Sequence, residues 1–196
     1  IIKIINKDGK KIANCGSPPL NSNILIKIYD NNKNEILDEL NIGEIIVSSD
    51  SVVEEYKTLQ IDDKKYLKSG DLGFLYQGEL FVTGRLKDMI IINGKNYYPN
   101  DFEWIIEKNN NIRGGSTSVF EDNNILIAVT EIKKISNNEN YKNIVESIKD
   151  NIIDIFGMYI KIYLIKPKTI PKTTSGKIKR QKCKEIYLTM KHLYVS

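Results

Sequence analysis

Histidine and cysteine are scarce in this sequence. The 196 residues contain one histidine, His192, and two cysteines, Cys15 and Cys183, which lie far apart and without a Cys-x-x-Cys spacing. A structural zinc ion needs about four ligands of these types, so a zinc site is excluded. We expect His192 to be a surface residue in a basic helical tail. With no other imidazole in the sequence, a nucleophile–histidine triad is excluded as well.

Long apolar runs are also missing. No stretch approaches the roughly 20 apolar residues of a membrane-spanning helix, and the N-terminus lacks the pattern of a signal peptide. We therefore expect a cytoplasmic protein with reduced thiols, although a Cys15–Cys183 disulfide stays open. The sequence begins at Ile1 rather than Met, which indicates a fragment, a processed product or a trimmed chain.

Charge is abundant, but its excess is small. The 29 basic and 25 acidic residues give a net charge of +4, and 41% of the residues are hydrophobic. This hydrophobic content suffices for the core of one domain or of two small ones. The mild positive excess weakly favours anionic ligands and does not by itself indicate nucleic acid.

Two hairpins are predicted in the middle of the sequence. The apolar segments 72–76 and 80–82 flank Gln77-Gly78, and a further apolar run over 89–92 ends at Asn93-Gly94. Short β-branched and aromatic runs on either side of such glycine turns are typical of antiparallel strands. The sequence around these hairpins predicts short strands before residue 85, an all-β subdomain or distorted barrel.

Beyond residue 88 the pattern changes to a small α+β domain. Pro99 fits the first turn of a helix, and Gly157 fits the end of another whose apolar residues recur at helical spacing. The remaining predicted elements are strands over 24–29, 43–47, 117–120, 125–132 and 160–165, the last being the final strand, and the second helix over 141–156.

Asp71 and Arg85 are the first candidates for contact with a ligand. An ionised carboxylate accepts two O–H donors at once, which suits the neighbouring hydroxyls of a ribose. Arg85 offers a fixed fork of donors for ribose or phosphate oxygens. From these residues alone the structural alternatives are favoured, namely a turn in which Asp71 caps its own backbone and a surface Arg85 paired with Asp88.

The C-terminal tail surrounds a small polar segment with lysines. Residues 173–176, Thr-Thr-Ser-Gly, predict a mobile loop that presents Lys177, whose compact charge can lie between a carboxylate and a phosphate. A basic stretch such as 166–191 is more often a solvated face or a surface for an anionic partner. A P-loop is excluded, because Ile178 follows Lys177 in place of Ser or Thr.

Four motifs of this sequence resemble those of the adenylate-forming enzymes. They are Ser69-Gly70-Asp71, Gly84-Arg85-Leu86-Lys87-Asp88, Asn96-Tyr97-Tyr98-Pro99-Asn100-Asp101-Phe102-Glu103 and Pro171-Lys172-Thr173-Thr174-Ser175-Gly176-Lys177-Ile178. The third is most similar to the motif of the fatty acyl-AMP ligases. Separated motifs in the right order make the resemblance specific, and it covers roughly residues 15 to 190.

The resemblance implies an α+β fold in two parts. Residues 1–86 would be the C-terminal part of a large adenylation domain, built as a small β-barrel-like subdomain. Residues 87–196 would be a compact, mobile α+β lid domain. The family's roles fall on Lys177 as the catalytic cation, on Asp71 and Arg85 as nucleotide-binding residues, on Lys87 as the hinge and on Gly94 in the hairpin lining the thiol channel.

The implied reaction has two steps. A fatty acid or related carboxylate attacks ATP, which Mg²⁺ normally accompanies, to give acyl-AMP and pyrophosphate. The acyl group then passes to a thiol, typically the phosphopantetheine of an acyl-carrier protein, with CoA as the other acceptor. These enzymes are ATP-dependent ligases of fatty acid and lipid metabolism.

The sequence departs from the family in one large respect. It contains neither a Gly/Ser/Thr-rich phosphate loop nor an aromatic-Gly-x-Thr-Glu motif, both of which lie upstream in the family. We therefore expect the C-terminal part of a ligase, inactive alone. The alternative is a non-catalytic module whose basic tail docks a carrier protein or nucleic acid. Aromatic RNA-binding signatures are absent, so nucleic acid is not expected.

Overall fold

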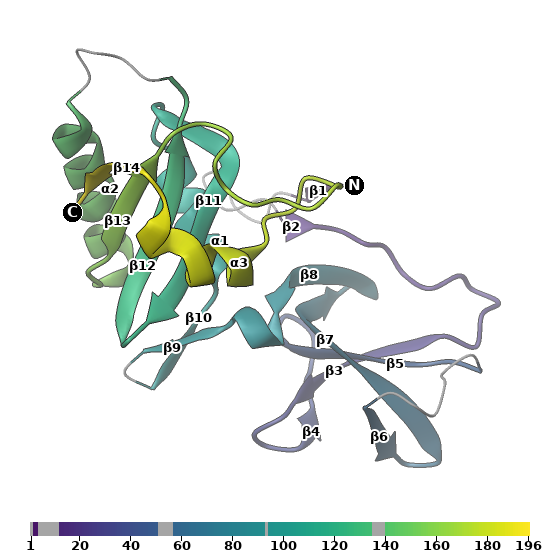
Figure 1. Ribbon diagram of the computed structural model, residues 1–196. Coiled ribbons are helices and arrows are strands. Elements are labelled where there is room, and N and C mark those ends of the chain that lie inside the picture. The colour runs from purple at the N-terminus through teal and green to yellow at the C-terminus, as the bar shows by residue number, and fades with distance from the viewer. Residues whose placement is uncertain (1, 4–11, 51–56, 93, 135–139) are drawn as a thin grey trace. The chain divides into compact units, whose positions relative to one another are not determined.

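The computed structural model describes residues 2–3, 12–50, 57–92, 94–134 and 140–196 (Figure 1). The chain divides into two compact units, Ile1–Met89 and Ile90–Ser196, each with its own sheet. Within the described ranges, no helix has the length and apolar character needed to cross a membrane.

The first unit is built on an antiparallel sheet. Its strands are β3 (Leu25–Asp30), β4 (Glu35–Ile36), β5 (Gly43–Ser48), β6 (Thr58–Ile61), β7 (Lys64–Tyr76) and β8 (Glu79–Arg85). They pair in the order β4-β3-β5-β7-β6, and β8 also pairs with β7. Two further strands, β1 (Ile2–Lys3) and β2 (Ile12–Ala13), pair with each other.

The sheet branches at β7 instead of closing. Residues 64–67 of β7 pair with β6, and residues 71–76 pair with β8, so β6 and β8 share one edge of this long strand. Its other edge pairs with β5. The described strands confirm an all-β subdomain, and among them no strand pairing that would close the sheet into a barrel is shown. With 13 residues, β7 is long enough to pair with β5 along one edge and with β6 and then β8 along the other.

The predicted hairpin between β7 and β8 is confirmed. Gln77 and Gly78 both have positive φ, 53° and 72°, as a two-residue turn of the I′ type requires. Phe74 and Phe81, directly opposite in the register, stack with ring centroids 5.0 Å apart. Gly73 precedes Phe74 in β7, and a Cβ at this position would come within 2.3 Å of the Phe81 carbonyl oxygen. Only glycine allows the two strands to approach this closely.

The second unit packs helices on both faces of a four-stranded sheet. The strands, in the order β11-β12-β13-β14, are β11 (Ile112–Asp122), β12 (Ile125–Ile132), β13 (Lys161–Ile165) and β14 (His192–Val195). β12 and β13 are parallel, and the other neighbours are antiparallel. The helices are α1 (Pro99–Glu107), α2 (Tyr141–Phe156) and α3 (Arg180–Ile186).

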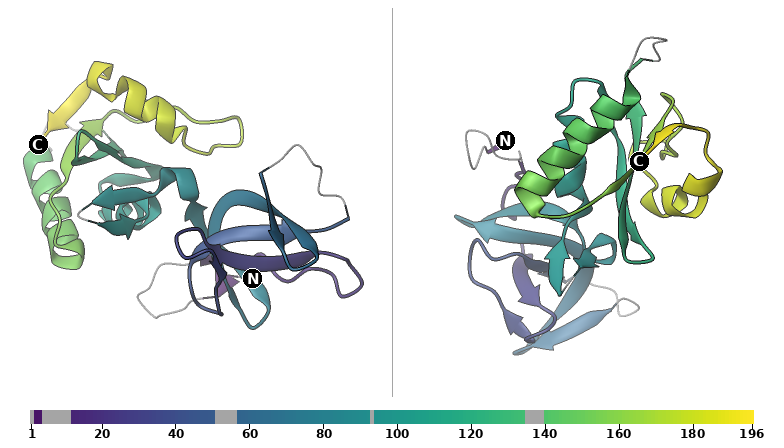
Figure 2. Two further views of the ribbon diagram at one scale, coloured as in Figure 1. Left: turned by 90° about the horizontal axis from the view of Figure 1, so that it is seen from below. Right: turned by 90° about the vertical axis from the view of Figure 1, so that its left-hand side faces the viewer.

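The alternation of side chains along β12 divides the core of this unit in two. Leu126 and Ala128 pack into the cluster that contains Phe102 of α1 and Ile148 of α2. Ile127 and Val129 point the other way, into the cluster that contains Cys183 of α3. Figure 2 shows α1 and α2 on one side of the sheet and α3 on the other.

The local signals for the helices are confirmed. Pro99 is at the start of α1, and α2 buries Ile144, Val145, Ile148 and Ile152. At the end of α2, Gly157 adopts a left-handed φ of 65° and its N–H donates to the Ile153 carbonyl. The second predicted hairpin is formed by β9 (Ile90–Ile92) and β10 (Lys95–Tyr97), and Asn93 of its turn lies outside the described residues.

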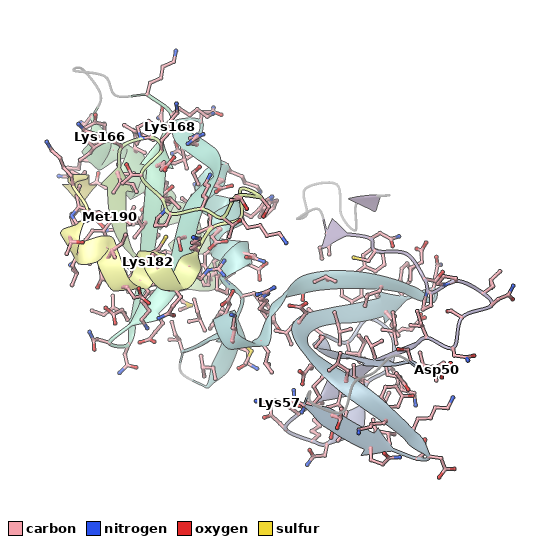
Figure 3. The ribbon with its side chains drawn as sticks, turned by 45° about the vertical axis from the view of Figure 1, so that its right-hand side comes forward. Asp50, Lys57, Lys166, Lys168, Lys182 and Met190 are labelled. Atoms are coloured by element: carbon pink, nitrogen blue, oxygen red, sulfur yellow. The ribbon has the colours of Figure 1, made fainter. Side chains whose placement is uncertain are left out.

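The tail differs from the helical tail expected from the sequence. After α3 come a 3-10 turn, Tyr187–Thr189, and β14, so the strand over 161–165 is not the last. His192 begins β14, half-buried, with Nε2 2.7 Å from the Tyr187 carbonyl oxygen and its ring against Tyr163. The prediction of a helical surface histidine was wrong, because β14 pairs with β13. Figure 3 shows Lys182 well apart from Lys166 and Lys168.

Candidate functional site

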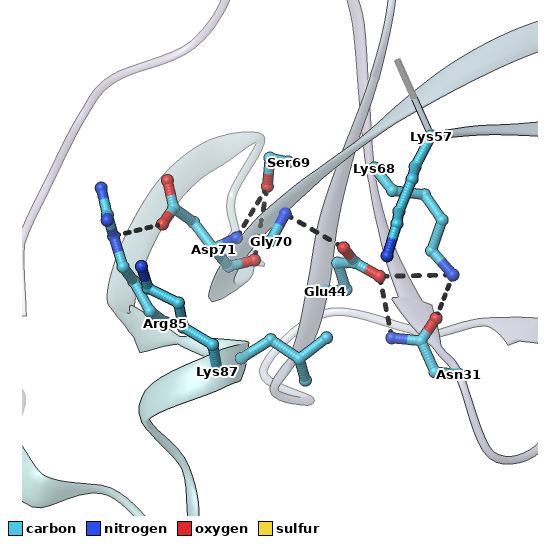
Figure 4. Close-up of a pocket in the computed structure, with 10 residues that line it drawn as sticks. Asn31, Glu44, Lys57, Lys68, Ser69, Gly70, Asp71, Arg85 and Lys87 are labelled. Carbon is cyan, nitrogen blue, oxygen red and sulfur yellow. Dashed lines mark hydrogen bonds and ion pairs between the residues drawn. The ribbon is translucent and has the colours of Figure 1, made fainter. Parts of the chain in front are cut away.

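A pocket of about 610 Å³ lies in the first unit, lined by the start of β5, the middle of β7 and the end of β8. Asp71, Arg85 and Lys87 line one part of it, and Glu44 and Lys68 line another (Figure 4). Acidic and basic groups therefore face the same cavity from three strands and from the turn that follows β8. Such a mixture suits a ligand that carries both hydroxyl groups and a negative charge.

The structure brings Asp71 and Arg85 together across the β7–β8 ladder. They are directly opposite in the register, and Arg85 Nε lies 3.2 Å from Asp71 Oδ1. Asp71 lies inside β7 rather than in a turn, and Arg85 forms its ion pair with Asp71 rather than with the Asp88 considered above. Their side chains are 40% and 57% exposed. An exposed pair of this kind is weak, so both groups can exchange it for a ligand.

The backbone beside Asp71 is fixed by hydrogen bonds to β5. Gly70 has a left-handed φ of +73°, and its N–H donates to Glu44 Oε1 at 3.0 Å. Ser69 Oγ donates to the Ile45 carbonyl at 2.7 Å and accepts from the Asp71 N–H at 3.0 Å. Each residue of the Ser-Gly-Asp motif thus has a defined part in the local structure, with the Asp71 carboxylate left to face the pocket.

Lys87 is the middle residue of a 3-10 turn, Leu86–Asp88, which directly follows β8. Its side chain is exposed and lines the same pocket as Asp71 and Arg85. The first unit ends at Met89, one residue beyond this turn.

Lys177 lies in the second unit, in a tight turn rather than in the loose loop expected from the sequence. Lys172 and Ile178 form a β-bridge, and the Thr173 N–H donates to the Lys177 carbonyl at 2.8 Å. Thr173 Oγ1 accepts from the Lys177 N–H at 3.1 Å, and Gly176 has a φ of +83°. The turn therefore presents the exposed Lys177 side chain from an ordered backbone.

The segment that leads into this turn is held by a buried carboxylate. Glu131 on β12 is 0% exposed and accepts from the N–H groups of Thr169 and Ile170, each at 2.7 Å. Arg113 Nη1 donates to its other oxygen at 2.7 Å. Burial alone would raise the pKa of Glu131, but the donors, Ile170 first among them, outweigh it and lower that pKa.

The segment that follows the turn is held by a partly buried ion pair. Arg180, the first residue of α3, donates to both oxygens of Glu103 on α1 at 2.9 and 3.1 Å. Glu103 also accepts from the Val119 N–H at 3.0 Å. Burial raises the pKa of Glu103, and the neighbouring Arg180 opposes that rise. The Lys177 turn is therefore anchored on both sides, to β12 and to α1.

Several cations of the basic tail take part in contacts within the unit. Lys172 Nζ donates to Ser116 Oγ at 2.9 Å, Lys184 donates to the Glu121 carbonyl, and Lys182 pairs with Glu185 at 3.3 Å. Of these cations, Lys182 is paired with a carboxylate, and so is Arg180, which binds Glu103.

Gly94 and the two cysteines are not part of the Lys177 turn. Gly94, with a φ of +73°, is exposed between β9 and β10. Cys15 is exposed and Cys183 is buried, and both are free thiols. In the part of the chain that the structure describes, no group of three or more His, Cys, Asp or Glu side chains is arranged to hold a metal ion.

Sequence reasoning missed the residues that hold these segments. The sequence places Glu44 in the strand predicted over 43–47 and Arg180 in the basic stretch 166–191, and it assigns a partner to neither. Glu103 lay in a recognised motif, so its position was the one available signal for the Arg180 pair. Nothing local marks Glu131, whose backbone donors are 38 and 39 residues away.

The Glu131 contacts give a prediction about stability and pH. Hydrogen bonds to a charged group contribute about 1.5–3 kcal/mol, so Glu131→Gln should lower the free energy of unfolding by about 2 kcal/mol at neutral pH. Because folding lowers the pKa of Glu131, its contribution is present above the usual value of 4.5 and is lost as pH falls through the folded value.

Urea unfolding near neutral pH and at about pH 3 measures this difference. The gap between the wild type and Glu131→Gln should narrow in acid. Glu146→Gln, at an exposed site on α2, is the control and should have little effect at either pH. A gap of the same size at both pH values would contradict the assignment.

Comparison with known proteins agrees with these motifs. The family model for the AMP domain of Disco-interacting protein 2-like proteins matches residues 87–195, more than half of the chain. The medium-chain-fatty-acid–[acyl-carrier-protein] ligase JamA of Moorena producens is 34% identical over 167 residues, which cover 75% of this chain and 28% of JamA. The long-chain-fatty-acid–AMP ligase FadD26 of Mycobacterium tuberculosis is 34% identical over 170 residues, covering 74% and 29%.

Solved structures show the same likeness. A structure from work on fatty acyl-adenylate ligases of E. coli and L. pneumophila matches with a TM-score of 0.75 and 31% identity, over 92% of this chain and 33% of that one. McyG, solved with phenylalanyl-adenylate, matches with a TM-score of 0.69 and 28% identity, over 91% and 34%. The chain thus spans about a third of the length of these proteins. It belongs to the Disco-interacting protein 2-like AMP-domain family and, with its relatives, to the adenylate-forming enzymes.

Proposed function

We propose that this chain is the C-terminal part of an acyl-AMP ligase that activates a fatty acid with ATP and passes the acyl group to a carrier-protein thiol. The observation that carries the proposal is the Asp71–Arg85 pair, which faces a pocket of about 610 Å³ from neighbouring strands. The family and the names of the ligases it resembles support an acyl-adenylate reaction.

The pocket of the first unit would bind the nucleotide. The two oxygens of Asp71 would accept the two hydroxyls of the ribose, replacing the weak contact with Arg85. Arg85, released from Asp71, would donate to ribose or phosphate oxygens. The 3.2 Å distance between Arg85 Nε and Asp71 Oδ1 supports this exchange, because a ligand that binds one of the two groups also lies within reach of the other.

Lys177 would act in the first step. A carboxylate oxygen of the fatty acid attacks the α-phosphorus of ATP, and the bond to the leaving pyrophosphate breaks. Negative charge grows on the α-phosphate oxygens during this attack, and a positioned ammonium stabilises it. The anchoring of the Lys177 turn by Glu131 and by Arg180 supports this role, because a preorganised charge needs no rearrangement during the reaction.

Lys87 and Gly94 would act in the second step. We propose that residues 1–86 and 87–196 move relative to each other about Lys87, so that the hairpin carrying Gly94 lines the route of the thiol. The thiol then attacks the acyl carbon and AMP leaves. JamA is named as an acyl-carrier-protein ligase, which supports a carrier protein as the acceptor. Other relatives are named as putative fatty-acid–CoA ligases, so CoA is the alternative acceptor. Mg²⁺ would accompany the ATP, bound mainly through its phosphate oxygens, and would offset part of their negative charge.

The first functional prediction concerns Lys177→Ala in the full-length protein. Loss of one preorganised charge should reduce fatty-acid-dependent pyrophosphate release on the order of 10²-fold. Transfer from supplied acyl-AMP should suffer less, because the α-phosphate is not attacked in that step. Lys179→Ala, at an exposed lysine two residues away, is the matched control. Equal losses in both half-reactions would count against the role of Lys177.

The second prediction concerns the hinge. Lys87 lies in a 3-10 turn, whose φ values overlap with the range that proline allows. Lys87→Pro should therefore permit acyl-AMP formation but restrict rotation at Lys87 and Leu86, and transfer to the carrier should be lost. Lys87→Ala should affect both steps only mildly, because a hinge acts through its backbone.

Each half-reaction is measured separately, at matched folding by circular dichroism. Normal transfer by the proline variant would show that the pivot lies elsewhere. A full-length protein that binds RNA with a strong salt dependence, and releases no pyrophosphate with any fatty acid, would favour a non-catalytic docking module.

A further inference from the structure

Glu44 is a buried carboxylate at the edge of the pocket, and the reaction proposed above does not use it. It lies on β5, is 3% exposed, and lines the same cavity as Asp71 (Figure 4). A carboxylate removed from water destabilises a fold unless several donors reach it. Glu44 has three partners, and each of its oxygens is used.

The two oxygens of Glu44 have different partners. Oε1 accepts from the Gly70 N–H at 3.0 Å. Oε2 accepts from Asn31 Nδ2 at 2.8 Å and lies 3.5 Å from Lys68 Nζ, which also donates to Asn31. Asn31 and Lys68 therefore hold one oxygen of the Glu44 carboxylate, and the Gly70 N–H donates to the other oxygen.

Gly70 lies at an irregularity of the β5–β7 ladder. Glu44 pairs with Leu72 and Ile46 pairs with Lys68, so one residue of β5 faces three residues of β7. Bulges of this kind redirect side chains and are frequent beside functional sites. The bulged residues here are Ser69, Gly70 and Asp71, and the Glu44 carboxylate takes up the Gly70 N–H that the ladder leaves without a strand partner.

We infer that Glu44 is a positioning residue for the nucleotide site, acting through Gly70 to set the direction of the Asp71 carboxylate. The inference rests on the proposed nucleotide role of the pocket. Gly70 holds a left-handed φ of +73°, a conformation that must be stabilised to persist within a strand. Asp71 is the next residue, so a change of backbone at Gly70 moves its carboxylate away from Arg85.

Two substitutions separate the position of Glu44 from its charge. Glu44→Asp keeps the charge for Lys68 but withdraws the acceptor from Gly70 by about 1.5 Å. Glu44→Gln keeps the length and an acceptor oxygen for Gly70 but loses the charge. The matched control is Glu39→Asp, because Glu39 accepts from the N–H of Gly78, another glycine of positive φ, in the β7–β8 turn.

The affinity of the full-length protein for AMP, measured by calorimetry, is the main readout. Small misplacements of a binding group lose one to two orders of magnitude, so we expect Glu44→Asp to bind AMP about tenfold more weakly. Glu44→Gln should recover most of this loss, and Glu39→Asp should bind as the wild type does. In the Asp71→Ala background, Glu44→Asp should cause no further loss, since coupled residues are not additive.

A purely structural role for Glu44 gives a different pattern. It would lower the melting temperature of the Glu44 variants without changing their AMP affinity. Alternatively, Glu44→Asp would weaken AMP binding in the Asp71→Ala background by the same factor as in the wild type. Either result overturns the inference, as does equal weakening by Glu44→Asp and Glu44→Gln. If Glu44→Asp does not fold, Gly70→Ala tests the same link. Its methyl group meets no atom within 4 Å, but alanine is strained at a φ of +73°, so the backbone beside Asp71 should shift. AMP binding unchanged in Gly70→Ala would then overturn it.

The reaction and the inference can fail separately. A wild-type protein that binds AMP but releases no pyrophosphate with any fatty acid would overturn the proposed reaction. The role of Glu44 would then still be decided by the AMP affinities of its variants. A wild-type protein that does not bind AMP would overturn both.

Discussion

The hydrogen bond from a backbone N–H to a buried carboxylate is the interaction on which both candidate sites depend. Glu44 holds Gly70 beside Asp71, and Glu131 holds Thr169 and Ile170 ahead of Lys177. A buried carboxylate that loses its donors is strongly destabilising, so each segment is confined to the conformation that supplies them. In both units, a buried charge on a strand therefore fixes an irregular stretch of backbone next to a candidate site residue, Asp71 in the first unit and Lys177 in the second.

Much of the fold could be predicted because its signals are local. The β7–β8 hairpin, the Pro99 start of α1 and the Gly157 end of α2 each depend on a few neighbouring residues. The open sheet and β14 could not be predicted in this way. β14 is only four residues long and is a strand because it pairs with β13, nearly 30 residues earlier. The same distance explains why His192 was assigned to a helix.

The residues of the candidate site also differ in whether the sequence could predict them. Asp71, Arg85 and Lys177 stand in motifs, so the resemblance to the adenylate-forming enzymes implies a role for each, whereas residue type alone favours structural alternatives. Their supports could not be predicted, because a buried charge gains its partners only when distant strands meet. Glu44 meets Gly70 across 26 residues, and Arg180 meets Glu103 across 77. Such residues look like ordinary surface charges until the sheet and helices bring their partners together.

The central claim is that the first unit's pocket binds a ribose through Asp71. The most direct measurement compares the affinities of the full-length wild type and Asp71→Ala for AMP and for 2′,3′-dideoxy-AMP. Two hydrogen bonds to a charged acceptor contribute about 3 kcal/mol or more. The wild type should therefore bind AMP about a hundredfold more tightly than the dideoxy nucleotide, and Asp71→Ala should bind both equally. An Asp71→Ala protein that still prefers AMP as strongly as the wild type does would contradict the account.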